Sequence, residues 1–216
     1  MKITNECNME LMSRYEDNHF DLAIVDPPYT DYLNTANWGE RAARQNKFKN
    51  NKGKYFQSTF QDKKPTNEYF NELFRVSKNQ IIWGGNYFIL PISRGWIFWL
   101  KGKQDNFFSD GELAWSSFDR VLKCFDFLWS GMLQGDMKNK EIKIHPTQKP
   151  VKLYEWLLMK YAKEGDNILD THLGSGSSAI ACHNLGYDLT ACELDKEYFE
   201  AAIKRLEQHK SQLRLL

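Results

Sequence analysis

Short apolar runs alternate along this chain with longer stretches in which apolar residues recur at helical spacing. This alternation predicts an α/β protein in which strands and helices follow one another. The predicted strands span residues 2–4, 22–25, 80–83, 96–100, 112–115, 125–129, 167–170 and 188–192. The predicted helices span residues 9–15, 68–76, 151–162, 177–185 and 196–210, with a short helical turn at 86–88. We expect strands 96–100, 112–115 and 125–129 to lie antiparallel at one side of the sheet.

Two segments lack this pattern and are predicted to be loops. Residues 30–66 are polar, rich in Asn, Lys and Gln, and poor in aliphatic side chains. A loop of that length without core-forming residues is usually functional or disordered. Residues 131–143 form the second loop. Because no repeat or linker interrupts the pattern, and 216 residues suffice for one well-buried domain, we predict a single domain over residues 1–216.

Composition narrows the class of protein. With 42% hydrophobic and 14% aromatic residues the chain is globular. No run approaches the roughly 18 apolar residues of a membrane span, and the first residues lack a signal-peptide core, so we expect a cytoplasmic protein. The four cysteines, Cys7, Cys124, Cys182 and Cys192, show neither a C-x-x-C pair nor metal-ligand spacing with the histidines. We therefore expect reduced thiols and no metal.

The predicted strand 22–25 ends in Asp26-Pro27-Pro28-Tyr29. Each proline lacks an N–H and has a fixed φ, so the pair excludes a continuing helix or an inner strand. The strand end therefore presents a carboxylate, a carbonyl and an aromatic ring in a rigid cluster. This suits a planar substrate with an exocyclic NH2, because Asp26 and the Pro27 carbonyl can accept its N–H groups while Tyr29 stacks on its ring. A plain Pro-Pro turn would explain the same residues, so the rest of the chain must decide.

A second candidate site follows the predicted strand 167–170. Gly174-Ser175-Gly176 lets the backbone approach a ligand closely, and the N-terminus of the next helix favours negative partial charge. Glu193 ends the following strand, where an acid can accept both ribose hydroxyls of a nucleoside-type cofactor. Because the loop also satisfies G-x-G-x-x-G/A, a nicotinamide-dinucleotide-binding enzyme must be considered. Too few residues follow Glu193 to complete a dinucleotide domain, which counts against that alternative.

Together the two motifs resemble those of S-adenosylmethionine-dependent amino-methyltransferases, which methylate N6 of adenine or N4 of cytosine. Their order, with Asp26-Pro27-Pro28-Tyr29 first and the glycine loop last, is similar to the circularly permuted β group of the DNA enzymes. Residues 108–115 are similar to a segment of small phage-type members. The resemblance implies a Rossmann-like methyltransferase fold, with a mixed, mostly parallel sheet that is flanked by helices and completed by the N-terminal strands.

The same resemblance implies which residues hold S-adenosylmethionine. Asn5-Glu6-Cys7 takes the place of the family's Gly-Asp-Cys, which implies Glu6 near the adenine amine of the cofactor. Residues 145–150, His-Pro-Thr-Gln-Lys-Pro, resemble a segment that caps a helix and holds the methionine end, although simple helix initiation would also explain them. The implied cofactor-binding residues are Glu6, Cys7, Thr147, Gln148, Lys149, Asp170, Thr171, His172, Leu173, Gly174, Ser175, Gly176, Ser177 and Glu193.

Two positions depart from the family pattern. Asp170-Thr171-His172-Leu173-Gly174 stands where the family usually has Asp-Pro-Phe-x-Gly. His172 thus replaces a phenylalanine beside the cofactor, either to tune binding or as a polar loop residue with its hydrogen bonds satisfied. Glu6 in place of Asp lengthens the side chain at the cofactor's adenine.

Basic residues gather after the proline-rich motif, although the net charge of the chain is only +1. A cluster next to the proposed site could hold a phosphate backbone, whereas the alternative is a solvated loop. A second basic run spans residues 138–152. The predicted nucleic-acid contacts are Trp38, Arg41, Arg44, Lys47 and Lys49.

These observations predict a site-specific DNA adenine-N6 methyltransferase that acts on a flipped-out base. The leading Asp26 favours adenine, because cytosine-N4 members of the family more often begin with Ser. A DNA cytosine-N4 methyltransferase and an RNA adenine methyltransferase are alternatives. A glutamine-amide methyltransferase is disfavoured because that family typically begins with Asn and is not permuted. A nucleic-acid-binding protein with a dead site is disfavoured because every expected polar group is present.

The prediction divides the domain into three parts. Residues 1–116 form the catalytic half, residues 117–144 a short target-recognition region, and residues 145–216 the cofactor-binding half. The sequence leaves open whether the chain forms a homodimer and whether it belongs to a restriction-modification system or a phage.

Overall fold

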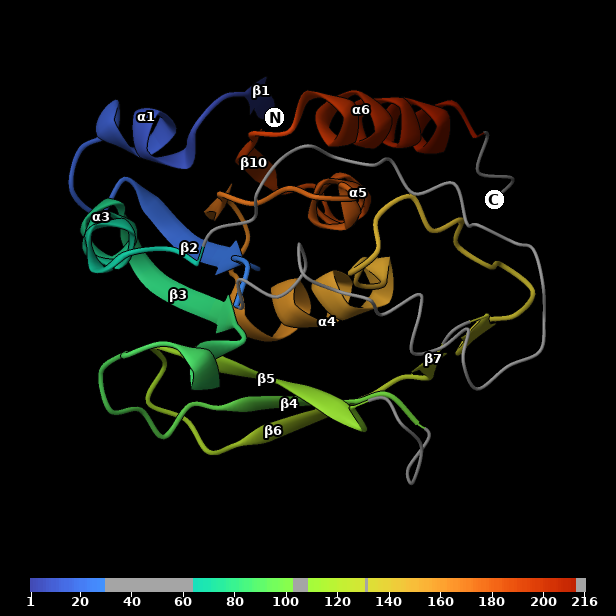
Figure 1. The fold of residues 1–216 in the computed structure, drawn as a ribbon, viewed down its shortest axis with the longest axis horizontal. Helices are drawn as coiled ribbons and strands as arrows, with labels where there is room; N and C mark the ends of the chain where they lie inside the picture. The colour runs from blue at the N-terminus through green and yellow to red at the C-terminus, as the bar shows by residue number, and fades with distance from the viewer. Residues whose placement is uncertain (30–63, 103–108, 131, 213–216) are drawn as a thin grey trace, which may run out of the picture.

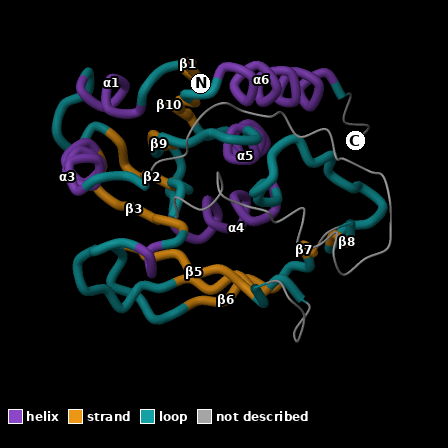
Figure 2. The backbone as a smooth tube through the Cα atoms, viewed as in Figure 1, coloured by secondary structure: helices purple, strands orange, loops and turns teal. Residues whose placement is uncertain are grey.

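The computed structural model describes residues 1–29, 64–102, 109–130 and 132–212 (Figures 1 and 2). Its strands are β1 (Lys2–Asn5), β2 (Phe20–Val25), β3 (Ser77–Trp83), β4 (Ile97–Leu100), β5 (Gly111–Ser116), β6 (Lys123–Asp126), β7 (Trp129–Ser130), β8 (Leu133–Gln134), β9 (Asn167–Asp170) and β10 (Asp188–Glu193). Its helices are α1 (Asn8–Ser13), α3 (Asn67–Val76), α4 (Val151–Tyr161), α5 (Ser177–Leu185) and α6 (Lys196–Ser211), with a 3-10 turn η2 (Gly85–Tyr87).

A single eight-stranded sheet organises the fold, in the order β1-β10-β9-β2-β3-β5-β4-β6. The first five strands in this order are all parallel, with Leu22 of β2 opposite Ile168 of β9 and Ile24 opposite Ile81 of β3. β5 runs antiparallel to both β3 and β4. The structure confirms the predicted α/β fold with a mixed, mostly parallel sheet. It also places the N-terminal strand β2 beside the C-terminal strand β9, as we predicted.

Successive residues of β2 face two different hydrophobic layers because side chains alternate across a strand. Leu22 and Ile24 join a core with α4, α5 and α6, whereas Ala23 and Val25 join a second core with α1 and α3. Figure 1 shows α1 and α3 on one face of the sheet and α4 and α5 on the other. Helices thus cover both faces of the parallel strands, which explains why β2 is apolar at almost every position.

Three predictions about the antiparallel side were wrong in detail. The predicted strand 125–129 is two strands: β6 begins at Lys123 and ends at Asp126, and β7 begins at Trp129. Between them, the Phe127 carbonyl accepts a 3.1 Å bond from the Trp99 indole. β8 lies within the predicted loop 131–143 and pairs with β7. β6 runs parallel to β4, because β5 is antiparallel to β4 and the chain reverses direction again between β5 and β6. It pairs at the outer edge of β4, since β5 already has a neighbour on each side.

The parallel strands place several polar residues at one edge of the sheet, because carboxyl ends of parallel strands meet there. Asp26 follows β2, Asp170 ends β9 and Glu193 ends β10. Asn5, at the end of β1, is paired in register with Glu193. This edge is where the candidate site lies. None of the helices that the structure describes is both long enough and apolar enough to cross a membrane.

Candidate active site

Asp26 lies at the centre of a cluster of charged side chains. Its Oδ2 accepts a hydrogen bond from the Lys149 ammonium, and its Oδ1 lies 3.1 Å from the Tyr29 hydroxyl. Glu112, on strand β5, which β3 separates from β2, lies 3.2 Å from the same hydroxyl and 3.1 Å from Lys149 Nζ. Lys101 forms an ion pair with the other oxygen of Glu112. The cluster therefore contains two carboxylates and two ammonium groups around one phenol.

Burial and neighbouring charges shift the pKa values of the two carboxylates in opposite directions. Burial raises the pKa of Asp26 above its ordinary value, against the opposing effect of Lys149. Burial would also raise the pKa of Glu112, but Lys149 and Lys101 outweigh it and lower that pKa to about 2. Two carboxylates whose environments push their pKa values apart can take different roles. Asp26 is thus the better proton acceptor, whereas Glu112 stays ionised.

The ring of Tyr29 is fixed from the side of strand β3. It stacks on Tyr87 with the ring planes 1° apart and the centroids 5.3 Å apart. Gly84, just after β3, has a φ of +66°, and a Cβ there would lie 2.2 Å from Tyr29 Cδ1. Only glycine combines this left-handed backbone with such close contact. The Gly84-Gly85 pair therefore does more than end a strand, because it makes room for the aromatic ring.

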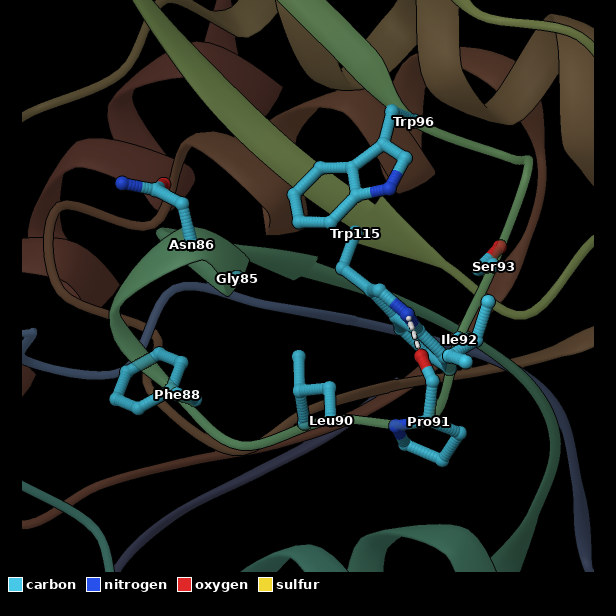
Figure 3. A pocket seen from close by; sticks show the side chains of 9 residues that line it. All are labelled: Gly85, Asn86, Phe88, Leu90, Pro91, Ile92, Ser93, Trp96 and Trp115. Carbon is cyan, nitrogen blue, oxygen red and sulfur yellow. Dashed lines mark hydrogen bonds between the residues drawn. The ribbon is translucent and has the colours of Figure 1, made fainter.

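A cavity of about 430 Å³ lies behind this turn, between segment 85–96 and Trp115 (Figure 3). Phe88, Leu90 and Trp96 form much of its wall, and the Trp115 indole donates a 2.8 Å hydrogen bond to the Pro91 carbonyl. None of the residues that line it is titratable. The chemistry of the candidate site is therefore concentrated at Asp26 and not in this cavity.

The glycine loop forms the other half of the site. Gly174 and Gly176 have φ values of +52° and +74°, which favour glycine. Glu193 accepts hydrogen bonds from the amides of Gly174, at 2.8 Å, and Asp195, at 3.0 Å. These bonds fix the carboxylate at the end of β10. The geometry fits a ligand with vicinal hydroxyls next to the loop.

Asp170 and His172 shape the base of this loop. The buried Asp170 carboxylate accepts bonds from the Ser178 hydroxyl and, at 3.0 Å, from the His172 amide. Burial raises the pKa of Asp170 to about 7 despite these bonds. The His172 ring nitrogens lie 3.1 Å from the Asn8 amide and 2.9 Å from the Thr171 hydroxyl, and burial lowers its pKa to about 3. His172 is thus a neutral ring with protein partners on both nitrogens.

The residues of the predicted segment 145–150 make contacts of different kinds. Thr147 is exposed, and its hydroxyl lies 3.1 Å from His145 Nδ1. Gln148 is buried, where its Oε1 accepts a 2.9 Å bond from the Ile144 amide. The side chain of Lys149 pairs with Asp26, and its carbonyl accepts a 2.7 Å bond from Ser177. The segment therefore links the glycine loop to the charged cluster, since the Lys149 carbonyl bonds to Ser177 and its side chain to Asp26.

Glu6 and Cys7 follow β1, next to Glu193. Both oxygens of Glu6 accept bonds from the Arg14 guanidinium, each at 2.6 Å. The Asn5 amide donates a 2.8 Å bond to the carbonyl of Glu193. The first and last strands of the chain thus meet at this corner, which brings Glu6 to the same sheet edge as the glycine loop.

The structure therefore brings the two predicted motifs to one sheet edge. The predicted nucleic-acid contacts, Trp38, Arg41, Arg44, Lys47 and Lys49, lie outside the described residues. Sequence reasoning missed Glu112, Lys101 and Tyr87 as members of the site. A signal for Glu112 was available, since it is a carboxylate in a predicted strand that continues with apolar residues. Within the described residues, no three His, Cys, Asp or Glu side chains gather to hold a metal ion.

The family match lies mainly in the C-terminal part of the chain. Residues 114–204 match the DNA methylase family of N6 and N4 methyltransferases. The type II methyltransferase M2.DpnII of Streptococcus pneumoniae is 40% identical over 80 residues, which is 37% of this chain and 30% of that protein. The chain therefore aligns with less than a third of the length of this relative.

Solved structures of DNA methyltransferases share the fold of the whole chain. The M1.HpyAVI–SAM complex superposes with a TM-score of 0.56 at 20% identity, covering 95% of this chain and 99% of that one. The cytosine-N4-specific PvuII DNA methyltransferase superposes with a TM-score of 0.58 at 11% identity, covering 99% and 87%. Identities this low show the common fold and leave the target base open.

Proposed function

We propose that this chain is an S-adenosylmethionine-dependent DNA amino-methyltransferase that methylates N6 of adenine. One observation carries the proposal: the Asp26 motif and the glycine loop, far apart in the sequence, follow the adjacent parallel strands β2 and β9. Ligands of open α/β sheets bind beyond the carboxyl ends of the strands. A substrate amine at Asp26 and a cofactor at the glycine loop would therefore lie next to each other. The DNA methylase match of residues 114–204 supports the same reaction.

The residues of the loop suit the proposed cofactor. Glu193 would accept the ribose hydroxyls, and the glycines would let the backbone lie against the nucleoside. Glu6 would face the cofactor's adenine, from the strand end beside Glu193. Thr147 and the start of α4 would hold the methionine carboxylate, because free helical amides attract a negative group. When bound, S-adenosylmethionine supplies a methyl group on a sulfonium.

The chemistry at Asp26 follows from the weakness of the nucleophile. The exocyclic amine of adenine has a lone pair delocalised into the ring, so it attacks poorly. Hydrogen bonds from its two N–H groups to the Asp26 carboxylate and the Pro27 carbonyl would free this lone pair. As nitrogen becomes cationic, the fixed carboxylate stabilises the developing charge. The buried Asp26 then accepts the proton that the methylated nitrogen releases.

The target base must leave the duplex to reach this site. Stacking on Tyr29 would contribute about 1–3 kcal/mol. Tyr87 already stacks on Tyr29 and is itself 48% exposed. The base would therefore either displace Tyr87 or stack on its exposed face.

Nucleoside mass spectrometry tests the proposal. Unmethylated DNA is incubated with protein and S-adenosylmethionine, and the wild type is expected to form N6-methyladenine. Asp26→Ala is expected to lower the rate by roughly a hundredfold to a thousandfold, because it removes the charge that stabilises the transition state. Asp119→Ala, at an exposed ion pair with Arg94, is the matched control and is expected to retain full activity.

Each other outcome has a distinct meaning. Full activity of Asp26→Ala would refute the role of the motif. N4-methylcytosine in place of N6-methyladenine would keep the mechanism and change the base, as the shared fold with the cytosine-N4 enzyme allows. A protein that binds S-adenosylmethionine and modifies neither base in DNA would exclude DNA as the substrate and direct the assay to RNA.

A further inference from the structure

Glu112 is a member of the charged cluster to which the proposed reaction assigns no role. It comes from β5, on the antiparallel side of the sheet, so it approaches Asp26 from the opposite direction to the glycine loop. Its side chain is 22% exposed, and its two oxygens are bound by Lys101 on one side and Lys149 on the other. A carboxylate held between two ammonium groups does not itself need to exchange protons. Its effect must pass through these neighbours.

The hydrogen bonds of Lys149 show how that effect would reach Asp26. An ammonium has three N–H donors. In Lys149 they meet Asp26, Glu112 at 3.1 Å and the Tyr29 hydroxyl at 3.0 Å. The Lys149 side chain is only 2% exposed, so water contributes little to its solvation. Glu112 therefore binds the same ammonium from the side away from Asp26, so the two carboxylates share the charge of Lys149.

The groups that face Asp26 come from every element around it, and their charges have opposing effects. They are Tyr29 on its own segment, Glu112 on β5, Lys149 before α4, Tyr154 on α4 and Asp170 on β9, with Lys101 behind Glu112. Burial raises the pKa of Asp26, Lys149 lowers it and Glu112 raises it. The two neighbours thus act on Asp26 in opposite directions.

We propose that Glu112 is a positioning residue that shares Lys149 with Asp26 and so keeps Asp26 able to accept a proton. This proposal rests on the proposed methyl transfer. In that reaction the N–C bond forms, the C–S bond breaks with its electron pair left on sulfur, and the nitrogen proton passes to Asp26. When Asp26 becomes neutral, Glu112 still holds the Lys149 charge, so the buried ammonium is never left without an anion.

Two isosteric or nearly isosteric variants test this arrangement by the pH dependence of kcat/KM. Lys149→Met removes the cation that lowers the pKa of Asp26, so the acid limb is expected to move to higher pH. Glu112→Gln removes the anion that raises it, so the acid limb is expected to move to lower pH. Charges at these distances shift a pKa by about 1 unit or more. We also expect Glu112→Gln to lower kcat by about tenfold to a hundredfold, since it releases the ammonium from its position.

The matched control is Glu72→Gln, which removes a carboxylate from an ion pair with Arg75 on α3, away from the cluster. It is expected to leave the acid limb and kcat unchanged. Glu112→Asp, which restores the charge, is expected to recover part of kcat and the wild-type acid limb. A purely structural role for Glu112 would lower activity without moving the limb. Unmoved limbs in both cluster variants, or shifts in one common direction, would overturn the proposal.

A measurement without turnover separates this proposal from the proposed function. The 13C resonance of the Asp26 carboxyl is followed through a pH titration in the wild type and in both variants. The midpoint is expected to rise in Lys149→Met and to fall in Glu112→Gln. If the wild type transfers no methyl group, the proposed function fails while this titration still decides the coupling. If transfer occurs and the midpoints coincide, only the role of Glu112 fails.

Discussion

At the scale of single residues, a few contacts determine whether the Asp26 motif has its observed geometry. Tyr29 is held by its hydroxyl in the charged cluster and by its ring between Tyr87 and Gly84. The sequence predicted a rigid carboxylate and ring at this strand end, since the two prolines exclude a continuing helix or an inner strand. It could not predict Glu112 or Lys101, because their contacts depend on how an antiparallel strand lies against β3.

Gly84→Ala is expected to destabilise the fold by about 1–3 kcal/mol and to abolish most activity. The left-handed φ of +66° costs about 1 kcal/mol for a residue with a Cβ, and the 2.2 Å approach to Tyr29 forces the ring to move. Gly165→Ala is the matched control, because Gly165 has a φ of +84° with nothing within 4 Å of its Cβ position. Urea unfolding and kcat are measured for both. Equal losses in the two variants would show that the contact with Tyr29 is unimportant.

At the scale of elements, the sequence predicted the positions of most helices and strands to within a residue or two. Its failures concern pairing, since periodicity identifies a strand without naming its neighbour. The same holds for links between elements that are distant in sequence. Arg205 of α6 donates a 2.8 Å bond to the Ser175 carbonyl in the glycine loop and forms a 2.6 Å ion pair with Glu141. Glu141 in turn accepts a 2.9 Å bond from the Val151 amide at the start of α4.

Arg205 therefore links α6 to the glycine loop and, through Glu141, to the start of α4. We expect Arg205→Met to lower the free energy of unfolding. The substitution leaves the mostly buried Glu141 without its cation, and breaking such a pair costs about 3–5 kcal/mol. The free energy of unfolding in urea measures the loss. Adding Glu141→Gln should recover part of it, because no unpaired charge then stays buried. Lys210→Met, which breaks an exposed pair on the same helix, is expected to cost below about 1 kcal/mol. Similar losses in Arg205→Met and Lys210→Met would contradict the structural role of Arg205.

At the scale of the whole molecule, the site exists because the sheet joins the two ends of the chain. β2 enters between β3 and β9, so Asp26 and the glycine loop become neighbours although most of the chain separates them. The resemblance of the motif order to that of the permuted DNA methyltransferases predicted this closure. It could not predict that Lys149, from the predicted cofactor segment, crosses to the carboxylate of Asp26, 123 residues away. Such a contact depends on long side chains packed in three dimensions, which no local pattern encodes.

This closure makes cofactor binding a property of the whole fold, and thermal unfolding can identify the cofactor. A ligand that binds only the folded chain stabilises it by about 2.7 kcal/mol at 100 times its Kd. For a chain of this size that corresponds to a rise in Tm of roughly 5–10 °C. We expect S-adenosylhomocysteine to produce this rise and NADH to produce none.

The carboxylate at the end of β10 allows the same measurement to test where the ligand binds. Glu193→Gln weakens acceptance of the ribose hydroxyls and is expected to reduce the rise in Tm, whereas Glu197→Gln, in the first turn of α6, should preserve it. A rise with NADH and none with S-adenosylhomocysteine would instead assign the glycine loop to a dinucleotide, since the G-x-G-x-x-A pattern alone fits both. Because both ligands carry a ribose, the part of each ligand beyond the ribose decides the comparison.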